Sequence, residues 1–362
     1  MKIHFILGRS VYPHKVGGME IFNYYLIDSL KNRFNISYQS THILGFNNVK
    51  WLKTYNLKPE KIFAPLQVLF FLLFQPSIKK VVISFSEAHW IVWYLYTQIN
   101  TFLGRDYFVI IHYGKSAPDK KYDVYKKFFD KAKKVIAVSQ DIKRNYDNKY
   151  NIDCEVIYPL VPFTESTIRK ESLRKEVGVP CNANVICMVG SIKGMKHPET
   201  ILEAVAKFSK EEKMKYNPHI VYAGKGNMMQ ELKEMAEKYG LTNRIHFLGF
   251  VPKEQVNKVF KMCDIYTISS DFEGTSVSLL EAMFNKMPVI ASDVPGINDM
   301  VKDGESALLF QVKNADEVKQ HIITILDYPE IAIKISEGAF KMYNAKYSYK
   351  DVIDKYIAIL DK

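Results

Sequence analysis

The chain has 362 residues, of which 48% are hydrophobic and 25% are charged. This length exceeds one ordinary domain and suits two domains of about 150–180 residues, each large enough to bury its own core. The composition is that of a globular protein and excludes a disordered, collagen-like or low-complexity chain.

The formal net charge of +11 lies in the first half of the chain. Residues 1–160 carry 23 Lys+Arg and 12 Asp+Glu, whereas residues 161–362 carry 27 of each. Residues 115–149 are especially rich in lysine. Such a segment fits a solvated face, or a surface that contacts anionic lipid or a phosphate-bearing acceptor. No aromatic–basic motif of RNA or DNA binding accompanies the charge, so we expect no nucleic-acid partner.

The cysteines and the N-terminus indicate the compartment. The four cysteines are Cys154, Cys181, Cys187 and Cys263. They form no CxxC pair and no Cys/His cluster with zinc-ligand spacing, which predicts reduced thiols. Residues 1–8 have a strand pattern and not that of a signal peptide. The apolar runs at 65–74 and 89–96 are shorter than the roughly 20 residues that span a bilayer. We expect a cytoplasmic protein, with peripheral contact at the inner face of the cell membrane as an alternative.

Short runs of β-branched and aromatic residues alternate with longer amphipathic stretches along the chain. In the first half, strands are predicted at Lys2–Leu7, Ile36–His42, Val81–Phe85, Tyr107–Ile111, Val135–Val138 and Glu155–Tyr158. In the second half, they are predicted at Val185–Val189, His219–Ala223, Arg244–Leu248, Ile265–Ile268, Pro288–Ala291 and Ala307–Phe310. The predicted helices between them include Glu199–Phe208, Met228–Tyr239 and Ala315–Leu326. This alternation predicts an α/β protein with two doubly wound parallel sheets, which bind ligands at the carboxyl ends of their strands.

Two prolines in Tyr158–Ser166 interrupt the strand and helix patterns and mark the expected domain boundary. We therefore predict a first domain at residues 1–160 and a second at residues 161–342. The remaining segment, residues 343–362, has apolar side chains at helical spacing. These side chains are Val352, Tyr356, Ile359 and Leu360.

The most informative segment is DFEGTSVSLLEA at residues 271–282, between a predicted strand and a predicted helix. Gly274 lets the backbone pass close to a ligand, and Thr275 and Ser276 can cap the helix. The N-terminus of that helix offers N–H groups and a partial positive charge to a phosphate. The segment thus predicts a phosphate-binding turn.

Two carboxylates belong to this segment, Glu273 in the loop and Glu281 in the helix. Both can accept hydrogen bonds from hydroxyl groups, one near a sugar and the other near a ribose. Taken alone, Glu281 also fits an ordinary surface position on a helix. The strand–loop–helix context and the PVIAS strand that follows favour a ligand site.

With these residues the chain resembles the retaining glycosyltransferases of the GT-B fold, specifically family 4. The resemblance covers nearly the whole chain and is densest from Cys187 to Phe310. It implies two Rossmann-like domains that face a cleft, the first binding the acceptor and the second the nucleotide sugar. It implies that Glu273 binds the donor sugar, that Glu281 holds the ribose hydroxyls, and that the backbone of Gly274–Ser276 meets the sugar and the diphosphate. It also implies that residues 343–362 pack back on the first domain.

The first domain carries two further segments of this resemblance. Gly17 and Gly18 precede a helix, as does the family's glycine pair, whose backbone approaches the donor phosphate. A plain β–α turn is the alternative, and Glu20 also fits a helix cap. His112 follows the strand Tyr107–Ile111, where family members have a histidine near the reacting sugar. A structural histidine is the alternative.

In the second domain, VGSIKGMKH at residues 189–197 resembles a family segment whose arginine and lysine neutralise the departing diphosphate. Lys196 matches the lysine. Ser191 stands where the arginine is usual, and Lys193 could substitute for it. A solvated surface lysine is the alternative for Lys196.

Two turns complete the resemblance. The glycines of Gly224-Lys225-Gly226 resemble a G-x-G turn of the family, although a tight turn explains them equally well. Residues 248–252, with Phe250 at their centre, resemble the loop whose backbone contacts the base. Contacts made by the backbone do not depend on side-chain identity, so the sequence of this loop does not predict which base is bound.

The resemblance implies a retaining, metal-independent glycosyltransferase of the hexosyltransferase type. The donor would be a UDP- or GDP-linked sugar, used as a substrate and not as a cofactor, and no metal-binding DxD motif is evident. The acceptor would be a glycan or a lipid-linked molecule, in surface polysaccharide biosynthesis. The candidate catalytic residues are His112, Lys196 and Glu273.

Three other functions compete with this prediction. An epimerase or phosphorylase would share the fold, but the two glutamates and the GTS loop favour family 4. A non-catalytic partner or acceptor-binding subunit of a glycosyltransferase complex would explain Ser191. A dinucleotide-dependent dehydrogenase is disfavoured because the first strand does not lead into G-x-G-x-x-G.

Overall fold

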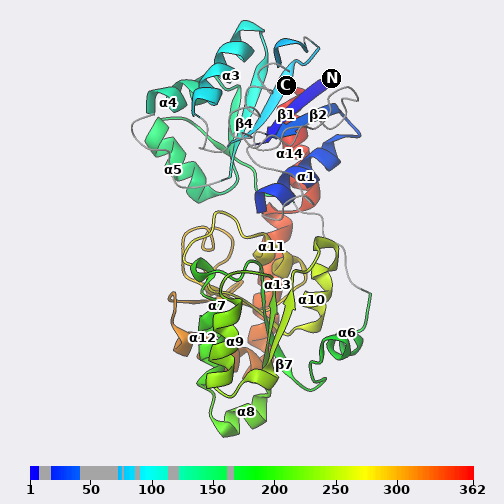
Figure 1. The fold of residues 1–362 in the computed structure, drawn as a ribbon, viewed down its shortest axis with the longest axis vertical. Coiled ribbons are helices and arrows are strands. Elements are labelled where there is room, and N and C mark those ends of the chain that lie inside the picture. Colours follow the sequence, from blue (N-terminus) through cyan, green and yellow to red (C-terminus); the bar gives the residue numbers. More distant parts are fainter. Residues whose placement is uncertain (8–17, 41–71, 76, 86–89, 113–121, 161–166) are drawn as a thin grey trace. The chain divides into compact units, whose positions relative to one another are not determined.

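The computed structural model describes the chain at residues 1–7, 18–40, 72–75, 77–85, 90–112, 122–160 and 167–362. The chain divides into two compact units, one formed by Met1–Pro162 with Ser348–Lys362 and the other by Phe163–Tyr347. Each unit has one six-stranded parallel sheet with helices packed against it (Figure 1).

The first sheet has the strand order β2-β1-β3-β4-β5-β6, and all neighbouring strands in it are parallel. Its strands are β1 (Lys2–Leu7), β2 (Asn35–Ser40), β3 (Lys80–Phe85), β4 (Asp106–Ile111), β5 (Lys134–Ala137) and β6 (Glu155–Val156). The strand order reverses between β1 and β3. This reversal is the switch point of a doubly wound sheet, the place where such sheets bind ligands.

The second sheet has the strand order β12-β11-β10-β7-β8-β9 and is also parallel. Its strands are β7 (Asn184–Val189), β8 (Pro218–Ala223), β9 (Ile245–Gly249), β10 (Ile265–Ile268), β11 (Val289–Ser292) and β12 (Leu308–Phe310). Here the order reverses between β7 and β10, so the loops that follow these two strands start side by side. All twelve predicted strands are present, and the predicted α/β fold class is confirmed.

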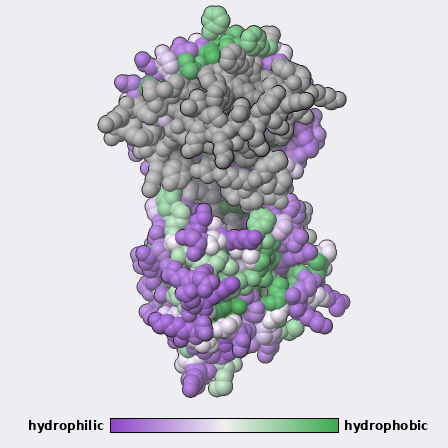
Figure 2. Space-filling model, in the orientation of Figure 1, coloured by the Kyte–Doolittle hydropathy of each residue, from purple (hydrophilic) through white to green (hydrophobic). Residues whose placement is uncertain are grey.

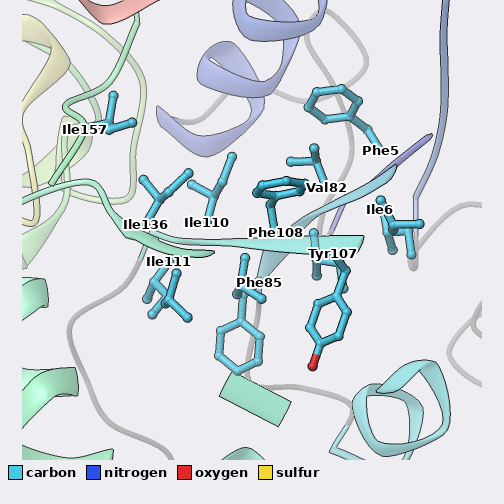
Figure 3. Close-up of a cluster of buried hydrophobic side chains, with 14 of the residues drawn as sticks. Phe5, Ile6, Val82, Phe85, Tyr107, Phe108, Ile110, Ile111, Ile136 and Ile157 are labelled. Atoms are coloured by element: carbon cyan, nitrogen blue, oxygen red, sulfur yellow. The ribbon is translucent and has the colours of Figure 1, made fainter. Parts of the chain in front are cut away.

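The core of the first unit covers both faces of its sheet. Neighbouring residues of β4 point to opposite sides, with Phe108 and Ile110 on one side and Tyr107 and Ile111 on the other (Figure 3). All four are buried. Because side chains alternate along a strand and both faces are covered, the strand has a continuous apolar sequence and no polar face.

The helices of the first unit include one from the end of the chain. They are α1 (Gly18–Leu30), α3 (Trp90–Phe102), α4 (Tyr122–Asp130), α5 (Gln140–Tyr150) and α14 (Tyr349–Asp361). The helix α14 begins at Tyr349 because the preceding helix ends at Lys346 and Ser348 caps the new one, its hydroxyl accepting a hydrogen bond from the Asp351 N–H. The helical segment predicted from residue 343 is therefore split between two helices.

The helix α14 is held on the first unit by apolar and polar contacts. Val352, Tyr356 and Leu360 are buried in the core of that unit. The Nζ of Lys80 donates a 2.6 Å hydrogen bond to the carbonyl of Leu360, and Arg33 forms an ion pair with Asp361. Cations at the C-terminus of a helix also interact favourably with its dipole.

The helices of the second unit surround its sheet. They are α6 (Lys170–Val177), α7 (Pro198–Ala206), α8 (Lys210–Tyr216), α9 (Met229–Lys238), α10 (Val256–Met262), α11 (Val277–Phe284), α12 (Ala315–Asp327) and α13 (Pro329–Lys346), with the 3₁₀ turns η2 (Gly194–Lys196), η3 (Thr242–Arg244) and η4 (Lys253–Gln255). The three helices named from sequence correspond to α7, α9 and α12. Hydrophilic residues dominate the visible face of this unit, with smaller hydrophobic areas between them (Figure 2).

A buried charge network fixes the amino ends of β7 and β10. The carboxylate of Asp264 accepts hydrogen bonds from the Arg174 guanidinium at 2.6 Å and from the Val185 N–H at 2.7 Å. The same guanidinium donates to the carbonyls of Met262 and Ala183. The two strands whose carboxyl ends meet at the switch point are thus fixed in register at their other ends.

Within the part of the chain that the structure describes, no helix has both the length and the apolar character needed to cross a membrane.

Candidate functional site

The candidate site lies at the carboxyl edge of the second sheet, in the loops that follow β7 and β10. The β7 loop contains Gly190, which adopts a φ of 139°, and leads into η2. The β10 loop contains the predicted EGTS residues and leads into α11. Since β7 and β10 are neighbours, both loops open at one switch point.

Two glycines hold the β7 loop against the loop after β8. A Cβ on Gly224 would lie 1.7 Å from the carbonyl oxygen of Gly190, and one on Gly226 would lie 1.8 Å from that of Ile192. The Ile192 N–H also donates a 3.0 Å hydrogen bond to the carbonyl of Lys225. The G-x-G turn therefore serves a close approach of two backbones, and neither of its glycines has a positive φ.

An ion pair joins the two loops at the switch point. The Nζ of Lys196, at the end of η2, contacts the Oε1 of Glu273. The hydroxyl of Ser270 donates a 2.9 Å hydrogen bond to the same oxygen. The side chains of Lys196 and Glu273 are 21% and 11% exposed, so the pair is largely withdrawn from water but still reachable. The structure thus brings two of the three candidate catalytic residues into contact.

A histidine missed by sequence reasoning, His197, also contacts residues near these loops. The contacts of its two ring nitrogens are named the clasp. The Nδ1 of His197 lies 2.8 Å from an oxygen of Glu199. Its Nε2 lies 2.7 Å from Oδ1 of Asp271. His197 has a φ of 42°, in the left-handed region that β-carbons disfavour. Two further bonds join the loops, from Ser269 Oγ to the carbonyls of Lys196 and His197.

The turn into α11 has the geometry that its sequence predicts. Ser276 caps the helix, its buried hydroxyl accepting a 3.3 Å hydrogen bond from the Leu279 N–H. The backbone N–H groups of the first turn have no acceptor inside the helix and carry its positive end. Gly274 and Thr275 are half-buried beside them. Behind this turn lies Gly296, with a φ of 86°, where a Cβ would sit 1.8 Å from the carbonyl oxygen of Glu273.

The second glutamate, Glu281, is buried and not on the surface. Its side chain is 4% exposed and forms an ion pair with Lys253 of η4, which is 7% exposed. Burial raises the pKa of the Glu281 carboxyl, and the attraction of the Lys253 ammonium acts against that rise. The structure therefore removes the simple surface alternative for Glu281 and adds a lysine that the sequence did not single out.

The remaining predicted residues of the second unit lie around this edge. Ser191 is half-buried and Lys193 is exposed. Phe250 follows β9 and is 44% exposed. The glycine before it, Gly249, has a φ of 67°.

In the first unit, His112 directly follows β4 at the carboxyl edge of the first sheet. Its Nε2 lies 3.0 Å from the Ser84 hydroxyl of the neighbouring strand, and the Phe22 ring of α1 contacts it edge-on, with centroids 4.8 Å apart. These contacts orient a half-buried imidazole. Gly17 lies outside the described residues, Gly18 begins α1, and Glu20 is buried in its first turn.

Comparison with known proteins shows what the second unit is similar to. Residues 169–342 match the model of the family "Glycosyl transferases group 1". The matched residues, named the group 1 domain for this similarity, contain every site residue described above except those of the first unit.

Two curated relatives share this domain. An uncharacterized glycosyltransferase of Methanocaldococcus jannaschii is 27% identical over 230 residues, which are 61% of this chain and 56% of the relative. The alpha-D-kanosaminyltransferase of Streptomyces kanamyceticus is 25% identical over 195 residues, 54% of this chain and 50% of the relative. The matched region thus spans little more than half the length of these relatives.

A solved structure matches the whole chain. Anabaena HepE, crystallised in complex with UDP, has a TM-score of 0.79 at 17% identity, with all of both chains covered. At this identity the likeness shows the fold, which is GT-B, as the sequence predicted.

Among the described residues, none of the His, Cys, Asp and Glu side chains gather in a group that could hold a metal ion. The four cysteines are unpaired thiols, and three of them are buried. Two residues that sequence reasoning missed are Lys253, which contacts Glu281, and His197, which contacts the carboxylates of Glu199 and Asp271. Neither contact leaves a signal in the local sequence.

Proposed function

We propose that the chain is a retaining glycosyltransferase that moves a sugar from a UDP- or GDP-linked donor to a glycan or lipid-linked acceptor. The observation that carries this proposal is the Lys196–Glu273 ion pair beside the N-terminus of α11. A cation and the positive end of a helix suit a diphosphate, and a carboxylate beside them suits the hydroxyls of a sugar. The bound UDP of HepE, on the same fold, is consistent with this donor class.

In this proposal, Lys196 and Glu273 separate from each other when the donor binds. The ammonium of Lys196 turns to the diphosphate, where negative charge develops as the glycosidic bond breaks. The carboxylate of Glu273 accepts hydrogen bonds from the donor sugar. Until the donor binds, the opposite charges of Lys196 and Glu273 compensate each other, which lowers the free-energy cost of keeping both partly buried.

The proposed transfer occurs on the face of the sugar from which the nucleotide departs. Because attack and departure share one face, the product keeps the anomeric configuration. The departing phosphate takes the proton of the acceptor hydroxyl, and no covalent intermediate forms. His112, oriented by Ser84 and Phe22, positions the sugar or the acceptor. We propose that transfer needs no metal, because Lys196 and the helix N-terminus supply the positive charge.

A panel of UDP, GDP, ADP and their sugar conjugates tests the donor site by thermal shift. One nucleotide should raise the melting temperature of the wild type, and Glu281→Ala should reduce or abolish that rise. If one conjugate is then turned over, an inverted product anomer, read by NMR, would contradict the retaining mechanism.

A second candidate is a non-catalytic partner that binds an acceptor. Ser191 favours it, because the site has one fewer cation than the family pattern. In that case none of the nucleotides in the panel should stabilise the protein.

We further propose that the acceptor belongs to surface polysaccharide biosynthesis and that the first unit contacts anionic membrane. The positive charge of residues 1–160 supports this proposal.

A further inference from the structure

Lys253 is paired with a candidate donor-site residue, although the donor-site motifs do not include it. It begins η4, four residues after the end of β9 at Gly249, on the loop that follows Phe250. Its side chain is nevertheless buried, 7% exposed, and its ammonium contacts the carboxylate of Glu281 on α11. A lysine seldom buries its charge in this way unless a partner compensates the loss of water.

The contact is part of a regular join between two helical segments. Four residues after Lys253, Asn257 of α10 accepts a 3.1 Å hydrogen bond from Asn285, which lies four residues after Glu281 on α11. Glu281 and its C-cap neighbour Asn285 are four residues apart and share one face of α11, so both contacts form one seam along this face. Asn285 also donates a 2.8 Å hydrogen bond to the carbonyl of Glu281. The seam therefore fixes both the backbone and the carboxylate of Glu281.

The charge of Lys253 affects the protonation of Glu281 and therefore the hydrogen bonds that Glu281 can accept. Burial alone raises the pKa of the Glu281 carboxyl, and the Lys253 ammonium is the group that opposes the rise. An ionised carboxylate can accept hydrogen bonds from two neighbouring hydroxyls, whereas a protonated one loses part of that capacity. Without the Lys253 ammonium, burial would raise the pKa of the Glu281 carboxyl further, and the carboxylate would lose its ion-pair partner.

We propose that Lys253 is a positioning residue of the nucleotide site, which holds the Glu281 carboxylate ionised and oriented toward the vicinal hydroxyls of a ribose. The inference rests on the proposed function, since it requires that the group 1 domain binds a nucleotide. It assigns Lys253 to the ribose and not to the diphosphate, so Lys253 does not replace the arginine missing at Ser191.

The test compares protein variants, each titrated with nucleotides that have or lack the ribose hydroxyls. UDP and GDP, each beside its 2′,3′-dideoxy form, are titrated calorimetrically into the wild type, Lys253→Met and the control Lys261→Met. Lys261 lies exposed on α10 and undergoes the same chemical change. The wild type and the control should bind the ribonucleotide about tenfold or more tightly than the dideoxy form, as expected for hydrogen bonds to a charged group. In Lys253→Met this preference should fall to about twofold or less.

Further variants keep the test informative if Lys253→Met is unstable, since breaking a buried ion pair is costly. Lys253→Arg retains the charge and should retain the preference for ribose. The double variant Lys253→Met/Glu281→Gln removes both charges and should fold but show no preference.

Each result has a distinct meaning. An undiminished ribose preference in Lys253→Met would overturn the inference. An equal loss of affinity for the ribo and dideoxy forms would also overturn it, because it would place Lys253 on the diphosphate. If the wild type bound neither nucleotide, the proposed function itself would fail.

Discussion

At the residue scale, His197 joins two carboxylates of the candidate site through its two ring nitrogens. It keeps a left-handed backbone conformation that costs a residue with a β-carbon about 1–2 kcal/mol. In return its ring lies between the carboxylates of Glu199 and Asp271, which are close in sequence to Lys196 and Glu273, respectively. Without the ring, these carboxylates would lose their shared partner.

We predict that His197→Gly folds but turns over its donor slowly. Glycine adopts the left-handed conformation freely, so the melting temperature should change little. The loops would lose the clasp, and a displacement of about 1 Å at reacting groups can cost about a hundredfold in rate. Steady-state kinetics with the donor identified by thermal shift should show kcat reduced at least tenfold and KM changed less.

The matched variant is His197→Asn, since asparagine tolerates the same backbone and retains a shorter polar side chain. It should recover part of kcat. A wild-type kcat in His197→Gly would show that the clasp has no role in catalysis.

At the scale of elements, the switch point depends on backbones that approach closely. The loops after β7 and β8 touch at Gly224 and Gly226, and the turn before α11 touches Gly296. A side chain at any of these positions would meet a carbonyl oxygen of the site. Such contacts cannot be relieved by a change of rotamer, because backbone atoms lie on both sides.

We predict that Gly226→Ala lowers the free energy of unfolding of the second unit by about 1–3 kcal/mol. Its Cβ would lie 1.8 Å from the Ile192 oxygen, so the β7 loop must move away. For a domain of this size, the melting temperature should fall by about 2–10 °C. Differential scanning calorimetry measures the change.

Gly194→Ala is the control for this effect. An added Cβ there meets no heavy atom within 4 Å, and the residue has no positive φ. Its melting temperature should stay close to that of the wild type. Equal destabilisation by both substitutions would argue against the close approach.

At the scale of the whole molecule, the distribution of net charge follows the division of the chain into two units. The two units have similar sheets, but the net charge of +11 belongs to residues 1–160. Among the described residues, several lysines of the first unit pair with its own acids, including Lys126 with Asp130 and Lys143 with Asp147. Such pairs reduce the local field, although the excess of positive charge remains.

We predict that the protein binds anionic liposomes at low salt and releases them as salt is raised. Exposed charges are screened within about 10 Å at 0.1 M salt, so the attraction should fall steeply. Co-sedimentation with phosphatidylserine vesicles measures the binding, and neutral phosphatidylcholine vesicles are the control. Failure to sediment with anionic vesicles at low salt would end the membrane proposal.

The sequence by itself determined the fold class, all twelve strands, and the turn from Glu273 to Ser276. These features depend on local periodicity, on glycine and on a capping serine, and neighbouring residues carry that information. The sequence also named Lys196, Glu273 and Glu281. It did not show that Lys196 and Glu273 form a pair, because they are far apart in the chain and meet only when β7 and β10 become neighbours.

Only the tertiary structure decided the contacts of Lys253 and His197. Lys253 looks like any exposed lysine after a proline, and its burial against Glu281 depends on how α10 packs beside α11. The clasp of His197 depends on a backbone conformation that local sequence does not dictate. Ion pairs between distant segments are set by packing, and packing appears only when the whole unit has folded.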